Sequence, residues 1–243
     1  MKDKSLSEKQ QNFKEGISVI CKGNRATCPL GKKNLTGTSL VGDSVNRERV
    51  EEDYYATPPE ATRVLLDNFG LNDCLTIYEP TCGEGHISKE LKRWFENRNL
   101  YPSIYSSDLI DRGYGVGGID FLKFNSDKKY DCIITNPPFK LSQEFIEKAL
   151  KLSNKYVIMF AKIQLLEGVA RKKLFDKFPP KYIYVFTNRV NPLRNGSPVD
   201  ENGKKWASTM CFAWFVWEIG FDGEPIVRWL ELNNGDKFFS SQP

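Results

Sequence analysis

From Tyr54 onward the sequence alternates between short β-rich runs and segments with a helical spacing of apolar residues, and this alternation restricts the possible folds most strongly. The predicted strands are 75–79, 103–108, 130–135, 156–161, 182–187 and 210–217, with a further short strand near 117–121. The predicted helices are 58–69, 86–97 and 141–152. Strands that alternate with helices of this length pair in parallel through helical crossovers, which predicts a doubly wound α/β domain.

Residues 1–45 lack this pattern and are rich in Lys, Gly, Ser, Thr and Asn, so we predict a weakly ordered N-terminal extension and a single domain over 46–243.

Charge is distributed unevenly along the predicted domain. Residues 140–210 hold fourteen Lys or Arg and six acids, a net charge of +8, whereas residues 46–139 carry a net charge of −5. A polyanion would bind the basic half, although single basic clusters are equally compatible with solvated helix faces. The candidate substrate contacts, centred on 162–206, are Lys140, Lys162, Arg194, Lys204, Lys205 and Trp206.

The cysteine pattern and hydropathy exclude some other classes. The six cysteines contain no Cys-x-x-Cys pair and the chain has one His, so we expect no metal site and reduced thiols. No apolar run approaches the length that spans a bilayer. We therefore predict a cytoplasmic protein with no membrane partner.

A glycine loop follows the strand predicted at 75–79, in the sequence Glu79-Pro80-Thr81-Cys82-Gly83-Glu84-Gly85-His86. Two glycines two positions apart let the backbone turn sharply and approach a ligand. A dinucleotide fingerprint requires a third glycine where Ser88 stands, and the Gly-Lys-Ser/Thr of a phosphate-binding P-loop is missing. The loop therefore predicts a nucleotide-like ligand that has no pyrophosphate.

Acidic residues near this loop favour S-adenosylmethionine as the ligand. Glu79 precedes the turn, where it would accept a hydrogen bond from a cationic amino group, and Asp108 ends the next strand, where a ribose diol would lie. Taken singly, Glu79 also fits a helix cap and Asp108 a turn residue, but together and in register they favour the cofactor. Asp120 and Phe121 would bind the adenine amino group and cover the ring.

The tetrapeptide Asn136-Pro137-Pro138-Phe139 follows a buried strand and carries the strongest chemical signal. Two prolines end the strand and stiffen the backbone, which holds carbonyl groups in fixed directions. The Asn136 side-chain oxygen and the Pro137 carbonyl would accept both hydrogens of a planar amine and present its nitrogen to a methyl group, while Phe139 stacks on the substrate. A loop terminator with a core phenylalanine is the competing interpretation of the tetrapeptide.

The chain resembles the amino-methyltransferases in four features that follow one another in the same order: Glu-Pro-x-x-Gly-x-Gly, Asp108, Asp120-Phe121 and Asn-Pro-Pro-Phe. The segment 53–59 resembles the Thr-Pro-Pro segment of DNA adenine-N6 methyltransferases, and the segments 191–197 and 213–217 resemble compact phage and prophage adenine methylases. The resemblance covers roughly residues 53–220. It implies a mostly parallel, seven-stranded Rossmann-like sheet with one antiparallel strand, filled by 210–217, and a target base flipped out of DNA. The residues that it implies for S-adenosylmethionine are Tyr55, Thr57, Pro58, Glu79, Pro80, Cys82, Gly83, Gly85, His86, Asp108, Asp120 and Phe121; those for the reacting amine are Asn136, Pro137, Pro138 and Phe139.

Other functions remain open at this point. The same tetrapeptide serves methyltransferases of RNA bases and of protein glutamine, because an amide presents the same planar amino group. A nicotinamide oxidoreductase is disfavoured by Ser88, and a non-catalytic DNA-binding module by the intact Asn136. DNA is the favoured partner and RNA the alternative.

Overall fold

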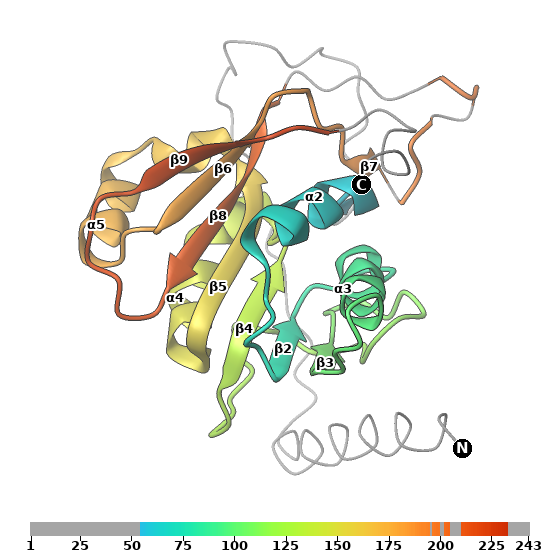
Figure 1. Ribbon diagram of the computed structural model, residues 1–243, viewed down its shortest axis with the longest axis horizontal. Coiled ribbons are helices and arrows are strands. Elements are labelled where there is room, and N and C mark those ends of the chain that lie inside the picture. Colours follow the sequence, from blue (N-terminus) through green and yellow to red (C-terminus); the bar gives the residue numbers. More distant parts are fainter. Residues whose placement is uncertain (1–53, 195, 200–201, 205–209, 233–243) are drawn as a thin grey trace, which may run out of the picture. The chain divides into compact units, whose positions relative to one another are not determined.

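A computed structural model describes residues 54–194, 196–199, 202–204 and 210–232. The main strands in this part of the chain are β2 (Thr76–Glu79), β3 (Ser103–Ser106), β4 (Tyr130–Thr135), β5 (Ser153–Lys162), β6 (Tyr182–Phe186), β8 (Phe212–Glu218) and β9 (Ile226–Leu230). They form a seven-stranded sheet in the order β3-β2-β4-β5-β8-β6-β9 (Figure 1). All neighbours are parallel except the two pairs that β8 makes with β5 and β6. The predicted doubly wound, mostly parallel sheet with one antiparallel strand is confirmed.

Helices cover both faces of the sheet. Helices α2 (Pro59–Phe69) and α3 (His86–Glu96) lie on one face, and α4 (Ser142–Leu152) and α5 (Val169–Lys177) lie on the other (Figure 1). Pro59 stands in the first turn of α2, where its missing N–H costs nothing, and Gly70 ends that helix with φ +72°. Three of the predicted helices are therefore present with nearly the predicted bounds, while α5 was not predicted.

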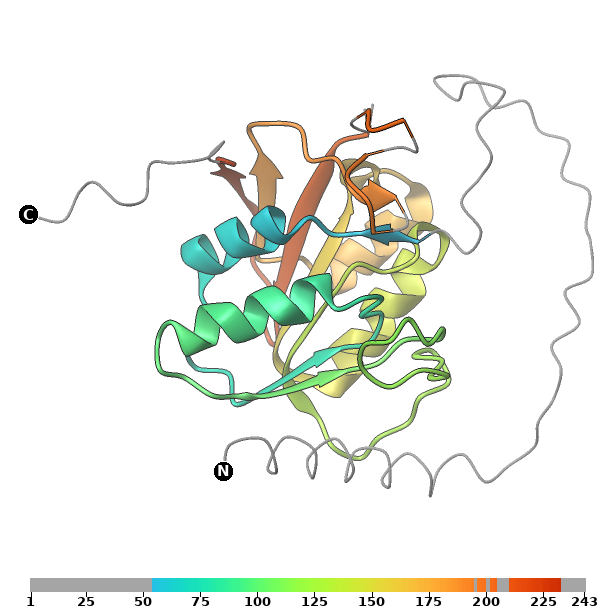
Figure 2. The same ribbon diagram turned by 90° about the vertical axis from the view of Figure 1, so that its right-hand side faces the viewer.

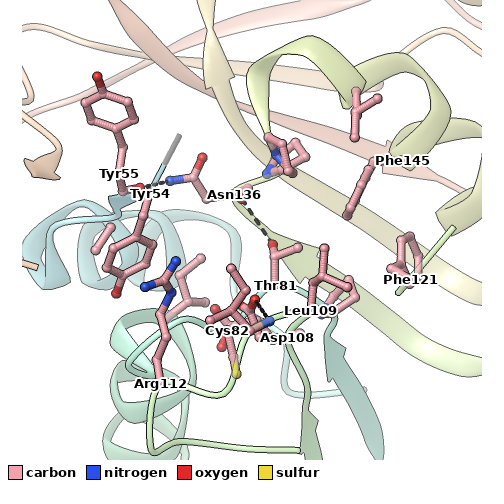
Figure 3. Close-up of a pocket in the computed structure, with 18 of the residues that line it drawn as sticks. Tyr54, Tyr55, Thr81, Cys82, Asp108, Leu109, Arg112, Phe121, Asn136 and Phe145 are labelled. Carbon is pink, nitrogen blue, oxygen red and sulfur yellow. Dashed lines mark hydrogen bonds between the residues drawn. The ribbon is translucent and has the colours of Figure 1, made fainter. Parts of the chain in front are cut away.

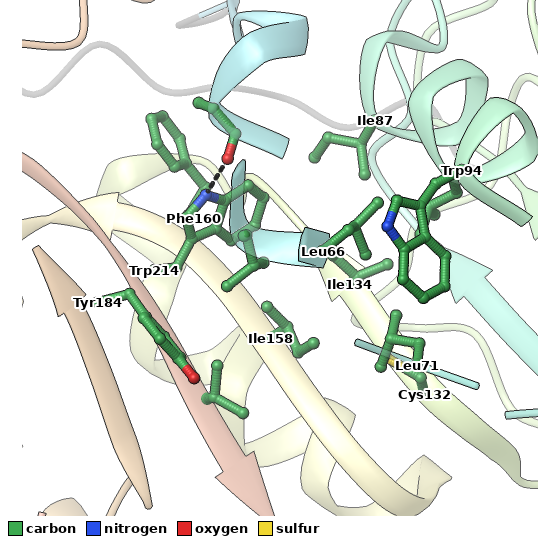
Figure 4. Packing of buried hydrophobic residues seen from close by; sticks show 14 of the residues in the cluster. Leu66, Leu71, Ile87, Trp94, Cys132, Ile134, Ile158, Phe160, Tyr184 and Trp214 are labelled. Atoms are coloured by element: carbon green, nitrogen blue, oxygen red, sulfur yellow. Dashed lines mark hydrogen bonds between the residues drawn. The ribbon is translucent and has the colours of Figure 1, made fainter. Parts of the chain in front are cut away.

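Strand β8 lies inside the sheet, between β5 and β6, and this position explains why its sequence is apolar without alternation. Figure 4 shows Trp214 packed with Phe160 and Ile158 beneath α2, and the Trp214 indole N–H donates to the Ala61 carbonyl at 2.9 Å. On the opposite face the Trp217 indole N–H donates to the Phe178 carbonyl, also at 2.9 Å. Because both faces of this strand are covered, all its side chains except that of Glu218 are buried, and both tryptophans satisfy their single polar group.

One predicted strand is wrong, and one strand of the sheet was not predicted. The segment 117–121 is not a strand; the chain there forms a loop tied to β3 by an isolated bridge between Ser107 and Val116. Gly113, Gly115 and Gly118 all have positive φ, between +71° and +79°, which is incompatible with an extended strand. The seventh strand is instead β9, an edge strand after a Gly- and Pro-containing turn, whose residues are mostly exposed.

A small two-stranded sheet was also not predicted. Strand β1 (Tyr55–Ala56) pairs antiparallel with β7 (Leu193–Arg194), so Tyr55 lies opposite Arg194 (Figure 2). Each strand has two residues, too few for any periodicity to show in the sequence. The pairing attaches the segment before α2 to the loop that follows β6.

The predicted extension 1–45 lies outside the described residues, and the proposed domain boundary stays a prediction. Within the described ranges, no helix is both long enough and apolar enough to cross a bilayer.

Candidate active site

A cavity of about 390 Å³ lies where the glycine loop after β2 meets the end of β4. Figure 3 shows Thr81, Cys82 and Asp108 along one side, Asn136 and Tyr55 at one end, and Phe121 and Phe145 at the other. The predicted residues that line it are Tyr55, Thr57, Glu79, Pro80, Cys82, His86, Asp108, Asp120, Phe121, Asn136, Pro137, Pro138 and Phe139. Pro58, Gly83 and Gly85 do not line the cavity. Both predicted ligand regions therefore share one cavity.

Gly83 shapes the glycine loop without lining the cavity itself. Its φ is +53°, and a Cβ at this position would lie 2.5 Å from Cε2 of Tyr54. The Tyr54 hydroxyl in turn accepts a hydrogen bond from the Glu84 N–H at 3.1 Å, and the Gly83 N–H donates to the Asp108 carboxylate at 2.8 Å. Only glycine permits both the turn and the close approach of Tyr54.

Glu79 lies fully buried at the end of β2 and lines the cavity. Its Oε2 accepts the Ser88 N–H at 2.9 Å and also the Ser88 hydroxyl. Burial raises the pKa of Glu79 to about 8, because removal from water penalises the charged form more than the Ser88 hydrogen bonds favour it. Glu79 therefore bonds to the start of α3, as the helix-capping interpretation required, and also faces the ligand space.

Asp108 lies at the middle of the cavity and is held by backbone donors on both oxygens. Besides Gly83, the Ile110 N–H donates to its Oδ1 at 3.0 Å. The turn interpretation is thus also correct, and the carboxylate still lines the cavity. A carboxylate has about four acceptor sites, so two backbone bonds leave capacity for a diol.

The far end of the cavity is apolar. The Phe121 and Phe145 rings lie 5.0 Å apart between centroids, and Leu109 also lines this end (Figure 3). Asp120 accepts the Leu122 N–H at 3.1 Å and forms an ion pair with Lys123 at 3.0 Å. A flat aromatic ligand group fits this end, with Asp120 beside it.

Asn136 is oriented by the segment before α2. Its amide Nδ2 donates to the Tyr55 carbonyl at 2.6 Å, and its backbone carbonyl accepts the Thr81 hydroxyl at 3.1 Å (Figure 3). The first bond fixes the orientation of the amide, and the amide oxygen is the atom of this side chain that can accept a hydrogen from a ligand. These two hydrogen bonds connect Asn136 to β1 and to the glycine loop.

Phe139 begins the short 3-10 helix η2 (Phe139–Leu141) and contacts aromatic and basic groups. The Tyr55 ring stacks on it with centroids 5.6 Å apart, and the Lys162 ammonium lies 4.0 Å from the centroid of its ring. Phe139 also packs against Phe212, at 5.8 Å. It is half-buried and packs against the hydrophobic core, as the competing interpretation required, while part of the ring stays exposed at the cavity.

Two polar atoms at the cavity are buried with no hydrogen-bond partner among the described residues: the Thr57 hydroxyl and the His86 Nδ1. Buried polar groups are normally paired, so these atoms indicate a ligand. Burial lowers the pKa of His86, which keeps the imidazole neutral and suits a contact residue. Together with the Gly83 turn and the carboxyl groups of Glu79 and Asp108, they fit S-adenosylmethionine, a cationic adenosyl cofactor.

The predicted substrate contacts lie in different places. The Lys162 ammonium lies over the ring of Phe139, which lines the cavity, and Arg194 is in β7, opposite Tyr55. Lys140 and Lys204 are exposed and do not line the cavity. Lys205 and Trp206 lie outside the described residues.

Sequence reasoning missed several residues that line the cavity, including Tyr54, Thr81, Leu109, Arg112 and Phe145. Tyr54 and Thr81 are neighbours in the sequence of predicted site residues, and this nearness is what could have identified them as lining residues. Arg112 comes from the glycine-containing loop after β3, and nothing in its local sequence points to the site.

The seven-stranded sheet with helices on both faces has the fold of the S-adenosylmethionine-dependent methyltransferases. A putative class I methyltransferase of this kind from Listeria monocytogenes superposes with a TM-score of 0.54 at 13% identity, covering 76% of this chain and 68% of that chain. A methyltransferase subunit of a type I restriction-modification system from Streptococcus thermophilus gives a TM-score of 0.52 at 11% identity, covering 73% of this chain and 47% of that chain. At these identities the likeness establishes the fold.

The sequence is also similar to one particular enzyme, the type II methyltransferase M.CvrRI of Paramecium bursaria Chlorella virus XZ-6E. The two are 28% identical over 98 residues, which is 38% of this chain. The matched segment spans about a quarter (26%) of the viral protein. No protein-family model matches the chain.

Proposed function

We propose that this protein transfers a methyl group from S-adenosylmethionine to an exocyclic amino nitrogen, and that the nitrogen is N6 of adenine in DNA. One observation carries the proposal: Asn136 lines the same cavity as the glycine loop, and its amide nitrogen donates to the Tyr55 carbonyl. The amide oxygen is thereby oriented as an acceptor before any substrate arrives. Such preorganisation lowers the barrier because no reorganisation is needed during the reaction.

When bound, S-adenosylmethionine supplies an electrophilic methyl group on a sulfonium, and the methyl–sulfur bond breaks as the nitrogen–carbon bond forms. The chain positions the amine for this transfer. The Asn136 oxygen accepts one amino hydrogen and the Pro137 carbonyl the other, which draws the nitrogen lone pair out of conjugation with the ring. Phe139 holds the plane of the substrate, and the proton that nitrogen loses passes to water.

Cofactor binding is assigned to the other residues that line the cavity. Thr57 and His86 offer buried polar atoms, Asp108 binds the ribose hydroxyls, and the apolar end at Phe121 and Phe145 takes the adenine. A nicotinamide dinucleotide is disfavoured because Ser88 stands where a dinucleotide-binding loop requires its third glycine.

Nucleic acid is favoured as the substrate by charge and placement. The Lys162 ammonium lies over Phe139, the expected stacking residue, and the +8 stretch 140–210 includes β7, which pairs with β1 next to Asn136. The similarity to a type II methyltransferase supports DNA over RNA. A protein glutamine side chain would need none of these basic groups.

The substrate is tested by supplying labelled S-adenosylmethionine to purified protein with DNA, RNA and protein in parallel, followed by digestion of the labelled product for mass spectrometry. We expect N6-methyladenine from DNA. Label that appears only in RNA or in glutamine would overturn the substrate while leaving the methyltransferase activity in place.

The role of Asn136 is tested by Asn136→Ala with Asn72→Ala, at an exposed turn, as the control. We expect Asn136→Ala to reduce the rate of methyl transfer by about 10²- to 10³-fold, the range for loss of one preorganised hydrogen-bonding group. Cofactor affinity, measured by calorimetry, should change less than about threefold. Turnover equal to that of the control variant would contradict the assigned role.

A further inference from the structure

The charges around the cavity are unequal. Among the described lining residues, Glu79, Asp108 and Asp120 carry carboxyl groups, and Arg112 is the one with a permanent positive charge. The other basic lining residue, His86, has a lowered pKa because it is partly buried, so it is neutral near pH 7. The acids suit the cationic groups of S-adenosylmethionine. Its amino-acid portion also carries a carboxylate, which needs a cationic partner.

Arg112 is held at the glycine loop by an aromatic platform. Its guanidinium carbon lies 4.1 Å from the centroid of the Tyr54 ring, and the Tyr54 hydroxyl accepts the Glu84 N–H of the loop at 3.1 Å. Stacking uses the face of a guanidinium, whereas its N–H donors point outward in the plane of the group. A stacked arginine is therefore oriented for two parallel hydrogen bonds to a carboxylate.

The order of groups along the cavity matches the order of groups in the cofactor. Figure 3 shows Phe121 and Phe145 at one end, Asp108 in the middle, and Arg112 with Tyr54 at the opposite side beyond Cys82. An adenine at the aromatic end and a ribose at Asp108 place the methionyl portion toward Arg112.

We propose that Arg112 binds the α-carboxylate of S-adenosylmethionine and sets the preference of this site for an amino-acid cofactor over one without a carboxylate. This inference rests on the proposed function, because it assigns a partner to one group of the same ligand. Arg112 acts in binding and takes no part in the methyl transfer itself.

The experiment compares S-adenosylmethionine with its decarboxylated form, which keeps the adenosyl, sulfonium and amino groups. Binding of both ligands is measured by calorimetry for wild-type protein, Arg112→Gln, Arg112→Lys and Lys89→Gln. Lys89 is a matched control: its ammonium lies 5.3 Å from the centroid of the Tyr114 ring next to the glycine loop, but the residue does not line the cavity.

We expect wild-type protein and Lys89→Gln to bind S-adenosylmethionine about 10- to 100-fold more tightly than the decarboxylated form, the range for charge-assisted hydrogen bonds. Arg112→Gln should bind the two ligands within about threefold of each other. Arg112→Lys, which keeps the charge but loses the planar fork, should show an intermediate preference.

Three results would overturn the inference. Arg112→Gln could bind both ligands with the wild-type affinities, or it could bind both more weakly by the same factor, which would assign Arg112 to supporting Tyr54 instead. A wild-type protein that binds both ligands with equal affinity would refute the inference alone, whereas one that binds neither would refute the proposed function. Thermal unfolding of each variant confirms that the protein is folded before binding is compared.

Discussion

Proton release on cofactor binding follows from the buried carboxyl group of Glu79. Its pKa is raised to about 8, so at pH 7 roughly nine-tenths of the ligand-free molecules carry Glu79 protonated. A cationic ligand beside this group favours the carboxylate and lowers its pKa. Binding below pH 8 must therefore expel a proton, at a cost of about 1.4 kcal/mol for each pH unit below the pKa.

The expected result is a dissociation constant for S-adenosylmethionine that falls about tenfold for each unit of pH rise between pH 6 and 8 and levels off above pH 8. Calorimetry in buffers of different ionisation enthalpy should report close to one proton released per cofactor at pH 7. Glu79→Gln is the matched control, because it keeps the size and polarity of the side chain and cannot ionise. The comparison with this variant also separates the proton released by Glu79 from any proton released by the ligand's own amino group, which titrates in the same pH range.

Equal proton release by the wild-type protein and by Glu79→Gln would refute the reasoning, since the released proton would then belong to the ligand or to another residue. An affinity for the cofactor that weakens as the pH rises from 6 to 8 would contradict the sign of the linkage.

Two further variants test the loop and the core. Gly83→Ala should weaken cofactor binding by at least tenfold, because its Cβ would lie 2.5 Å from the Tyr54 ring. Gly113 also has a positive φ, of +78°, but a Cβ there would have no atom within 4 Å, so Gly113→Ala should bind normally in the same calorimetric assay. Trp214→Phe should lower the free energy of unfolding by about 2–4 kcal/mol in denaturant titrations, because it removes the buried hydrogen bond to the Ala61 carbonyl and creates a cavity. Tyr101→Phe, at a side chain that is 73% exposed, is the control for the second variant, and a loss of stability equal to that of this control would exclude the structural role given to Trp214.

Local patterns were sufficient for most of the fold. The run 130–135 and the strand that contains Trp214 and Trp217 are apolar enough to require burial on both faces, and Pro59 and Gly70 mark the ends of α2. The segment 117–121 was mistaken for a strand because short apolar runs do not distinguish a strand from a loop that packs against the core. The edge strand β9 was missed because it is largely exposed and lacks the apolar signal of a buried strand.

The candidate site also combines motifs that local sequence indicates with contacts that depend on the tertiary fold. Local sequence is enough to predict the glycine loop, the acid at Asp108 and the Asn136 tetrapeptide as candidate site residues, because each motif depends on the backbone freedom or rigidity of neighbouring residues. Only the tertiary structure placed the Tyr55 carbonyl against Asn136, Lys162 over Phe139, and Arg112 on Tyr54. These partners are between 23 and 81 residues apart in the chain, and contacts at such separations arise from the packing of the sheet and its loops, which no local pattern records.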